Sequence, residues 1–296
     1  MDVQKPTPRK QHFVPQFLLR EWATDEPRTQ MWVYDKLRGQ ARKQNVRDTA
    51  TQSDYYEVLV EAGAMEALLS KLESAASLVF ARICSDNSLR SMDLKDVHNA
   101  ALFMVVQAVR TPSFFSSTQR VLGADGDSVL IPRRTTPLLT DVKRINEAAA
   151  LVREKLWTLR IAPHENEYLF SDHPLGFTAH RGEQIRGFAD AFRSTTIHMP
   201  ISPVHCLLLF PEQKFWIPGT RQVKNGFVLD EVQESTPEEV LSLNTYQVVM
   251  SNRFVFDRSG SFAFVEDCLQ RNPAARNGSL TTDVGRVNWA TDPRSS

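Results

Sequence analysis

The stretch RKQHFVPQFLLREWA, residues 9–23, decides how the fold begins. Apolar residues at positions 13, 14, 17, 18, 19 and 22 surround His12, Pro15 and Gln16. Apolar side chains of this kind are mostly buried, so the segment is expected to be ordered and to dock on the rest of the protein. The polar residues then have two interpretations. Either they form the first wall of a site, or they are hydrogen-bonded core groups that fix where the segment docks.

The composition is that of an ordinary globular protein. Of the 296 residues, 42% are hydrophobic and 24% are charged, which is enough apolar material for a sizeable core. The formal net charge is zero, and this excludes a global attraction to nucleic acid or anionic lipid. Cys84, Cys206 and Cys268 are widely spaced and form no CxxC pair. This cysteine pattern indicates a reducing compartment rather than a disulfide framework or a structural zinc.

The sequence shows no targeting or membrane segment. The opening MDVQKPTPRKQ lacks the apolar core of a signal peptide;. The longest apolar runs, ALFMVV and CLLLF, are far below the roughly 20 residues that a membrane-spanning helix needs;. We therefore expect a soluble, cytoplasmic protein without a membrane partner.

Hydrophobic periodicity predicts the main elements. Apolar residues recur at three- and four-residue steps over residues 62–84, 93–110 and 136–162, which predicts three long helices. A further helix is expected from Thr236 to about Arg253, because Thr is a good N-cap and Pro237 suits a first turn. Runs of β-branched and aromatic residues predict strands at 31–36, 54–60, 168–177, 197–210 and 225–232.

The order of these elements favours the α+β class. Strands and helices are segregated along the chain rather than alternating. We expect a central helical bundle packed against a small, mostly antiparallel sheet from the second half of the chain. Residues 9–256 would form a single domain. Residues 257–296 would form a C-terminal extension with a polar, partly disordered tail from Gln270 onward.

The predicted helix at 93–110 carries two polar residues in apolar surroundings. Gln107 needs hydrogen-bond partners, because an unpaired buried amide costs roughly 1–3 kcal/mol. Arg110 has two interpretations: an ion pair with Glu73 of the preceding helix, or a binding group for a substrate phosphate or carboxylate. Glu66 and Glu73 are seven residues apart, so they share one helix face.

The sequence FSDHP, residues 170–174, places polar residues at the end of an apolar strand. Asp172 is expected either to cap a turn through backbone amides or to present a carboxylate to a site from a rigid strand end. Ser171 stands beside it. His173 is a poor companion for Asp172, because adjacent strand residues point to opposite faces.

The remaining histidines do not form a familiar motif. No HExxH, GxSxG, Walker lysine loop or GxGxxG occurs;. His198, His205 and Cys206 are close in sequence, but the two histidines would lie on opposite faces of one strand. No metal ligand is therefore assigned. His12 is either a hydrogen-bonded core residue or an acid/base catalyst, and a helix beyond Pro15 would align it with Gln16 and Arg20.

A series of motifs runs in order along the chain: QHFVPQFLLR, VYDK (33–36), DYYE (54–57), LLSKLESAAS with Glu73, QAVRTP with Gln107 and Arg110, Trp157, FSDHP, MPISP (199–203), and LNTYQVVMSNRFVF with Asn244. On these motifs the chain resembles the bacterial DUF4238 family, a domain of unknown function, over roughly residues 9–256. His173 departs from the family, which tends to carry Asn there, and this weakens a catalytic role for His173.

The resemblance implies a role for a set of polar residues that belong to the family's pattern. They come from an N-terminal segment, two helices and a strand end, which implies one shared pocket. The set comprises His12, Gln16, Glu73, Gln107, Arg110, Ser171 and Asp172.

The first functional hypothesis is a hydrolase that acts on a phosphate-containing substrate. It would be a nuclease or nucleotide hydrolase of the kind found among bacterial defence or toxin proteins. His12 would be the general acid or base, and Glu73 or Asp172 would bind a divalent metal or act as a base. Arg110 would hold the anion. Substrate orientation would fall to Gln16, Gln107 and Ser171.

The alternative is a non-catalytic binding or regulatory protein whose buried polar network fixes one packing. The sequence leaves open whether the chain is an enzyme. It also leaves the cofactor open, with a divalent metal as one alternative, and it identifies no protein partner. Under the first hypothesis the partner is a nucleic acid or nucleotide substrate.

Overall fold

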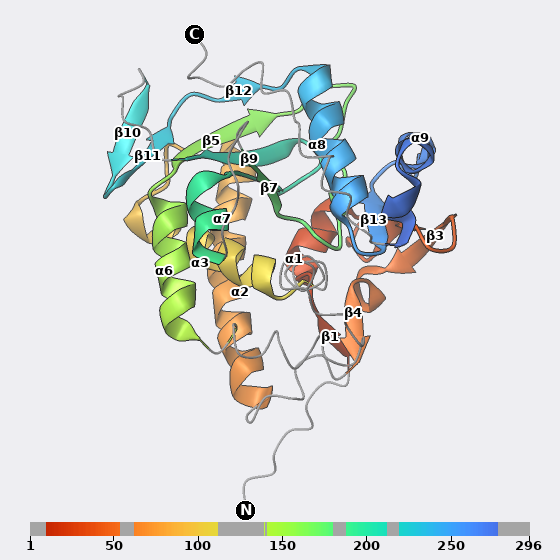
Figure 1. The fold of residues 1–296 in the computed structure, drawn as a ribbon, viewed down its shortest axis with the longest axis horizontal. Helices are drawn as coiled ribbons and strands as arrows, with labels where there is room; N and C mark the ends of the chain where they lie inside the picture. Colours follow the sequence, from red (N-terminus) through yellow and green to blue (C-terminus); the bar gives the residue numbers. More distant parts are fainter. Residues whose placement is uncertain are drawn as a thin grey trace, which may run out of the picture.

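The computed structural model describes residues 10–53, 62–111, 139, 141–179, 188–211 and 219–277 (Figure 1). Within these residues the protein combines helices with three β-sheets, which confirms the α+β class. The strand expected at 54–60 lies outside the described residues. No described helix combines the length and apolar character needed to cross a membrane.

The largest sheet comes from the second half of the chain and has seven strands. β5 is central: it pairs antiparallel with β9 and parallel with β11 and β12. The strand order is β10 (Thr220–Val223), β11 (Gly226–Leu229), β5 (Leu156–Ile161), β9 (His205–Phe210), β8 (Thr196–Pro200) and β7 (Gly176–Thr178), with β12 (Gln233–Glu234) also on β5.

Two further sheets join distant parts of the chain. The first is a hairpin of β2 (Gln30–Asp35) and β3 (Gln40–Asn45), completed by β13 (Phe254–Asp257) and β6 (Phe170–Ser171) in the order β3-β2-β13-β6. All its pairs are antiparallel. In the second, β1 (Lys10–His12) pairs with β4 (Thr51–Ser53). β2 and β3 thus share a sheet with two strands from later in the chain, whereas β1 and β4 pair with each other.

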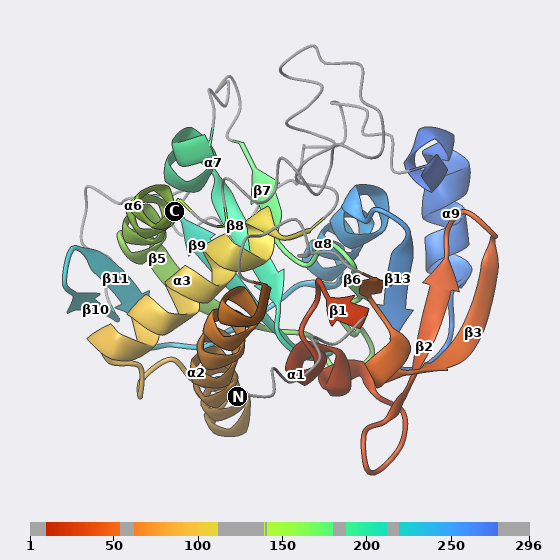
Figure 2. The ribbon, with the colours of Figure 1, turned by 90° about the horizontal axis from the view of Figure 1, so that it is seen from below.

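The helices cover both faces of the large sheet. α3 contacts α2 and α6, and α6 contacts α7, so these four form one layer (Figures 1 and 2). α8 packs on the opposite face. The described helices are α1 (Gln16–Leu19), α2 (Ala62–Asp86), α3 (Leu94–Val109), α6 (Val142–Arg153), α7 (Phe188–Ser194), α8 (Pro237–Met250) and α9 (Ala263–Arg271), with 3-10 turns η1 (Arg20–Trp22), η2 (Val46–Asp48) and η3 (Pro273–Asn277).

Alternation along β5 and β9 explains this two-sided packing. Successive strand residues point to opposite faces, and here both sets are apolar. Trp157 and Leu209 join the core beneath α3 and α6, whereas Leu156 and Leu208 join Leu243 of α8. The structure therefore does not confirm the expected arrangement, a helical bundle against a small, mostly antiparallel sheet: the sheet has seven strands, and helices lie on both of its faces.

Local signals placed three helices well. Asp93 caps α3, and it forms a capping box with Asp96 in which each side chain bonds the other's backbone amide;. Thr236 caps α8 by accepting a hydrogen bond from the amide of Glu239 at 3.2 Å;. α2 spans Ala62–Asp86, close to the expected 62–84.

The long helix expected at 136–162 is wrong beyond Arg153. α6 ends there, and Leu156–Ile161 forms strand β5. The apolar spacing of this segment suits either element. Pairing with three other strands and burial on both faces decide for a strand, so tertiary contacts override the local helical pattern;.

The described part of the C-terminal extension is packed against the protein. α9 and η3 form an apolar cluster with α8 and β2, as Figure 2 shows for α9 beside β2. Lys36, fully buried, donates hydrogen bonds to the carbonyls of Val248, Ser251 and Ala275 at 2.9, 2.6 and 2.8 Å. Burial lowers the pKa of Lys36 to about 8. The end of the expected tail, residues 278–296, lies outside the described residues.

We predict that Gly176→Ala destabilises the protein by about 1–3 kcal/mol, the usual cost of overpacking a core. A Cβ at this position would lie 1.9 Å from the ring of His198, which the adjacent strand holds against Gly176. Chemical denaturation measures the change. The same substitution made in a His198→Ala background should cost much less, and equal costs in the two backgrounds would show that the clash is not the cause.

Candidate functional site

The opening stretch is docked by its apolar residues. Val14, Leu18 and Trp22 have no exposed surface. The indole of Trp22 donates to the carbonyl of Tyr168 at 2.9 Å and stacks on Phe170 with ring centroids 4.3 Å apart. Pro15 precedes α1, which it can do without loss because a helix begins with unpaired amides;. The chain therefore turns sharply between β1 and α1.

A buried hydrogen-bond network ties this segment to α2 and α3. Gln107, fully buried, donates to the carbonyl of Phe13 at 2.9 Å. Its side-chain oxygen accepts from Nε of Arg110 at 2.7 Å. Nη1 of Arg110 lies 2.6 Å from Oε1 of Glu73. One guanidinium thus connects two helices directly and the N-terminal segment through Gln107.

The geometry of Arg110 decides between its two interpretations. Its side chain is 1% exposed, and it pairs with a carboxylate that is 28% exposed. The expected partner on the preceding helix is therefore the observed one. Direct anion binding by Arg110, as expected under the first hypothesis, does not fit, because the guanidinium lies behind Glu73 rather than at a surface.

A polar pocket of about 380 Å³ lies between the opening segment and α2. Three residues expected at a site, His12, Gln16 and Glu73, line it together. The described residues that line it are Gln11, His12, Gln16, Phe17, Glu66, Leu69, Ser70, Glu73, Ser74 and Ser77. Gln107 and Arg110 stand behind this wall and act through Phe13 and Glu73.

Among the residues that line the pocket, His12 is the strongest candidate for an acid/base group. Its Nε2 is shielded from solvent and has no hydrogen-bond partner among the described residues. Burial lowers the pKa of His12, against smaller opposing effects from the backbone of Val46 and the carboxylate of Glu73. The imidazole is therefore neutral at neutral pH. His12 lies on β1 rather than on α1, so it does not share a helix face with Gln16 and Arg20.

A second carboxylate, not assigned from the sequence, lines the same pocket. Oε2 of Glu66 is shielded from solvent without a hydrogen-bond partner among the described residues. Glu66 and Glu73 lie two turns apart on α2, and both face the pocket. The seven-residue spacing of the two glutamates was the sequence signal that could have placed Glu66 in the pocket with Glu73. Gln11, the first residue of the QHFVPQFLLR motif, also lines the pocket, although it was not assigned to a site.

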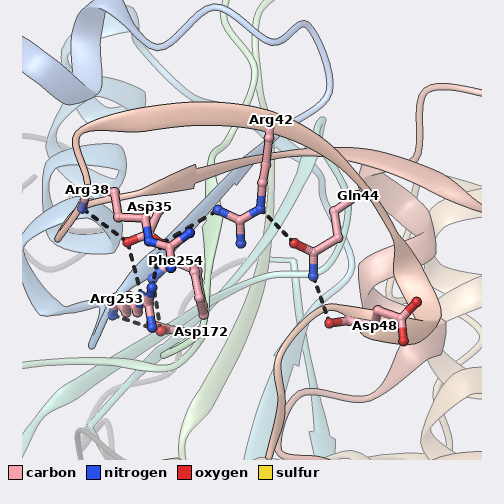
Figure 3. Close-up of polar contacts among 8 residues, drawn as sticks. All are labelled: Asp35, Arg38, Arg42, Gln44, Asp48, Asp172, Arg253 and Phe254. Carbon is pink, nitrogen blue, oxygen red and sulfur yellow. Dashed lines mark hydrogen bonds and ion pairs between the residues drawn. The ribbon is translucent and has the colours of Figure 1, made fainter.

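Asp172 is held away from this pocket by main-chain contacts (Figure 3). Its carboxylate, fully buried, accepts hydrogen bonds from the amides of Asn252, Arg253 and Phe254 at 2.7, 2.8 and 2.9 Å. Burial raises its pKa, and these amides and Lys36 oppose the shift. Asp172 therefore caps the turn between α8 and β13, the first of its two interpretations.

The surroundings of Asp172 complete this structural role. Nε and Nη2 of Arg253 donate hydrogen bonds to the two carboxylate oxygens of Asp35, at 3.0 and 2.7 Å. Figure 3 shows this pair beside Asp172. Ser171 donates to the side chain of Gln247 at 2.7 Å and is fully buried. Of the seven polar residues expected to share one pocket, His12, Gln16 and Glu73 line it, whereas Gln107, Arg110, Ser171 and Asp172 are not among its described lining residues.

Two buried histidines lie near this second cluster. Nδ1 of His173 is 2.9 Å from the hydroxyl of Thr111, which links the end of α3 to the strand end. His198 has no hydrogen-bond partner at either ring nitrogen among the described residues and meets Tyr246 edge-on, with centroids 4.4 Å apart. Burial lowers the pKa of His173 to about 4 and that of His198 to about 3.

The described residues hold no group of three or more His, Cys, Asp or Glu arranged to bind a metal ion. His205 instead bonds Ser202 and Asn87, both at 2.7 Å. The three cysteines are free. Burial raises the pKa of Cys84 to about 12, so this thiol is a poor nucleophile;.

Comparison with known proteins gives a family. The family model described as "Protein of unknown function (DUF4238)" matches residues 10–261. The chain belongs to this family, as the sequence resemblance indicated. No curated protein and no solved structure matches the chain. Family membership supplies no reaction, so function has to be argued from the pocket.

We predict that Glu73→Gln lowers the free energy of unfolding by about 2 kcal/mol, since it removes the negative charge that lies 2.6 Å from the buried guanidinium of Arg110;. This expected loss is smaller than that for a fully buried ion pair because Glu73 is partly exposed;. Denaturant titration measures it. Glu66→Gln is the matched control on the same helix and pocket, and it should change stability by less than about 0.5 kcal/mol. Equal losses in both would contradict the network described.

Stability should fall as the pH drops below about 6.5. His173 and His198 are neutral in the fold, so the unfolded state binds more protons once the pH passes below the ordinary histidine pKa;. The stabilisation is complete above that pH. Toward pH 4 it is lost at about 1.4 kcal/mol per pH unit for each histidine. Denaturation at a series of pH values should give a shallower slope for His198→Gln, and an unchanged slope would refute this.

Proposed function

We propose that the protein is a hydrolase in which His12 acts as general base in the pocket between β1, α1 and α2. The observation that carries this proposal is the unpartnered Nε2 of His12, shielded from bulk water in the wall of a polar pocket. A neutral imidazole with a free lone pair accepts a proton from a water molecule at neutral pH. The water oxygen then attacks the substrate, and the leaving group takes up a proton.

The charges of the pocket favour a substrate that arrives with a divalent cation. None of the described residues lining the pocket is Lys or Arg, whereas Glu66 and Glu73 both line it. Mg²⁺ is commonly bound by one or two carboxylates together with substrate phosphates. A phosphate-containing substrate, a nucleotide or nucleic acid, would therefore enter as its metal complex. We also propose a cytoplasmic location, as expected from the cysteine pattern.

The roles of the network residues differ from those first expected. Arg110 fixes the carboxylate of Glu73 from behind, and Gln107 fixes the backbone of Phe13 next to His12. Both are positioning residues. Gln16 lines the pocket and offers an amide to a substrate, although its oxygen accepts from Arg20 at 3.1 Å.

A non-catalytic binding or regulatory protein is the second candidate. The observation that favours it is the continuous bonding among Phe13, Gln107, Arg110 and Glu73, which joins three segments with short contacts. A network of this kind fixes one packing of the chain even without a reaction.

We predict that His12→Asn lowers kcat by about 100-fold or more, the usual contribution of a general base. Purified protein is assayed with Mg²⁺ against nucleotides, RNA and DNA, with phosphate release and strand cleavage as readouts. In the wild type, kcat/KM should rise with pH through a midpoint below 6.5, because the pKa of His12 is lowered.

His164→Asn is the control, because His164 is exposed and does not line the pocket. It should retain full activity. Turnover that survives His12→Asn would refute the proposed base. Absence of turnover on every substrate, combined with a lower melting temperature for Arg110→Met, would favour the non-catalytic candidate.

A further inference from the structure

A second hollow, of about 560 Å³, lies at the far end of α3 from Arg110. It is an open depression lined by the N-terminus of α3, the C-terminus of α6 and the β10–β11 turn. The described lining residues are Asp93, Leu94, Lys95, His98, Arg153 and Lys224. Lys95 lies twelve residues before Gln107 on α3, about 18 Å along the helix axis, and none of the described residues lines both hollows.

Three cations from three elements line this hollow. Lys95, Arg153 and Lys224 form no ion pair within the part of the chain that the structure describes. The lining contains one carboxylate, Asp93, whose oxygen accepts the amide of Asp96 at 2.8 Å as the helix cap. The lining therefore carries a net positive charge in a protein whose formal net charge is zero.

The imidazole of His98 is affected by the positive charges that line the hollow. Nη1 of Arg153 lies 2.6 Å from Nδ1 of His98, so the imidazole accepts and is neutral;. Burial lowers the pKa of His98, and the charges of Arg153 and Lys224 lower it further.

The backbone holds the turn that carries Lys224 against α6. A Cβ on Gly226 would lie 2.0 Å from the carbonyl oxygen of Arg153, so only glycine permits this approach;. Lys224 itself adopts φ +58°, a left-handed conformation that is uncommon for a lysine;. The cations are thus brought together by packing.

We propose that this hollow binds a phosphate dianion or diphosphate group, at a site separate from the pocket of His12. Arg153 offers a planar fork suited to phosphate oxygens. Lys95 and Lys224, both exposed at the rim, would contribute point charges from either side. A neutral His98 donates from its second ring nitrogen. This site does not depend on hydrolysis in the first pocket.

The test follows the pKa of His98 by NMR during titration with inorganic phosphate and pyrophosphate, with sodium chloride at matched ionic strength as reference. A bound anion should raise the pKa of His98, and pyrophosphate should act at lower concentration than phosphate. A single-stranded oligonucleotide without a terminal phosphate forms a separate arm. A response to the oligonucleotide alone would overturn the assignment to a phosphate dianion.

Two variants remove cations from the lining. Arg153→Gln and Lys224→Asn should each weaken binding about tenfold or more, as expected for loss of a charge-assisted hydrogen bond. Asn tolerates the left-handed conformation, so Lys224→Asn keeps the turn. Lys143→Gln is the control, because Lys143 lies on α6 with its side chain 85% exposed and outside the hollow. An unchanged pKa of His98, or equal weakening by Lys143→Gln, would overturn the proposal.

Discussion

A guanidinium with 1% of its surface exposed has to be neutralised and hydrogen-bonded, and much of the N-terminal half is arranged around that need;. Glu73 supplies the charge, and Gln107 supplies an acceptor. The other end of the Gln107 amide reaches the carbonyl of Phe13. The position of the opening segment is therefore coupled to the packing of α2 against α3 through Arg110.

The same contacts shape the pocket. His12 is the residue before Phe13, so the bond that anchors Phe13 also limits where the imidazole lies. Glu73 faces the pocket while its charge is balanced from behind by Arg110. Stability and the proposed chemistry thus depend on shared groups, and the second hollow at the other end of α3 is free of that coupling. The two cavities also differ in charge, one lined by carboxylates and the other by cations.

Sequence reasoning succeeded where the signal is local. Apolar periodicity placed the start of α3, the cap residue Thr236 placed the start of α8, and helix adjacency made Glu73 a natural partner for Arg110. Residues 156–161 were predicted as helix because their apolar spacing continues that of α6, and only pairing with distant strands makes them β5. Asp172 could not be separated from the site, because the amides it binds lie 80 or more residues away. Such contacts have no local pattern.

The pairing of β5 has a consequence for how the chain is made. Every strand that pairs with β5 lies later in the sequence, from β9 at 205–210 to β12 at 233–234. The free edge of β2 in the β2–β3 hairpin likewise pairs only with a much later strand, β13 at 254–257. A nascent chain on the ribosome therefore carries unpaired, largely apolar strand edges until nearly all of it has emerged. Such long-range pairing folds slowly, so the growing polypeptide is a natural client for chaperones that shield strand edges.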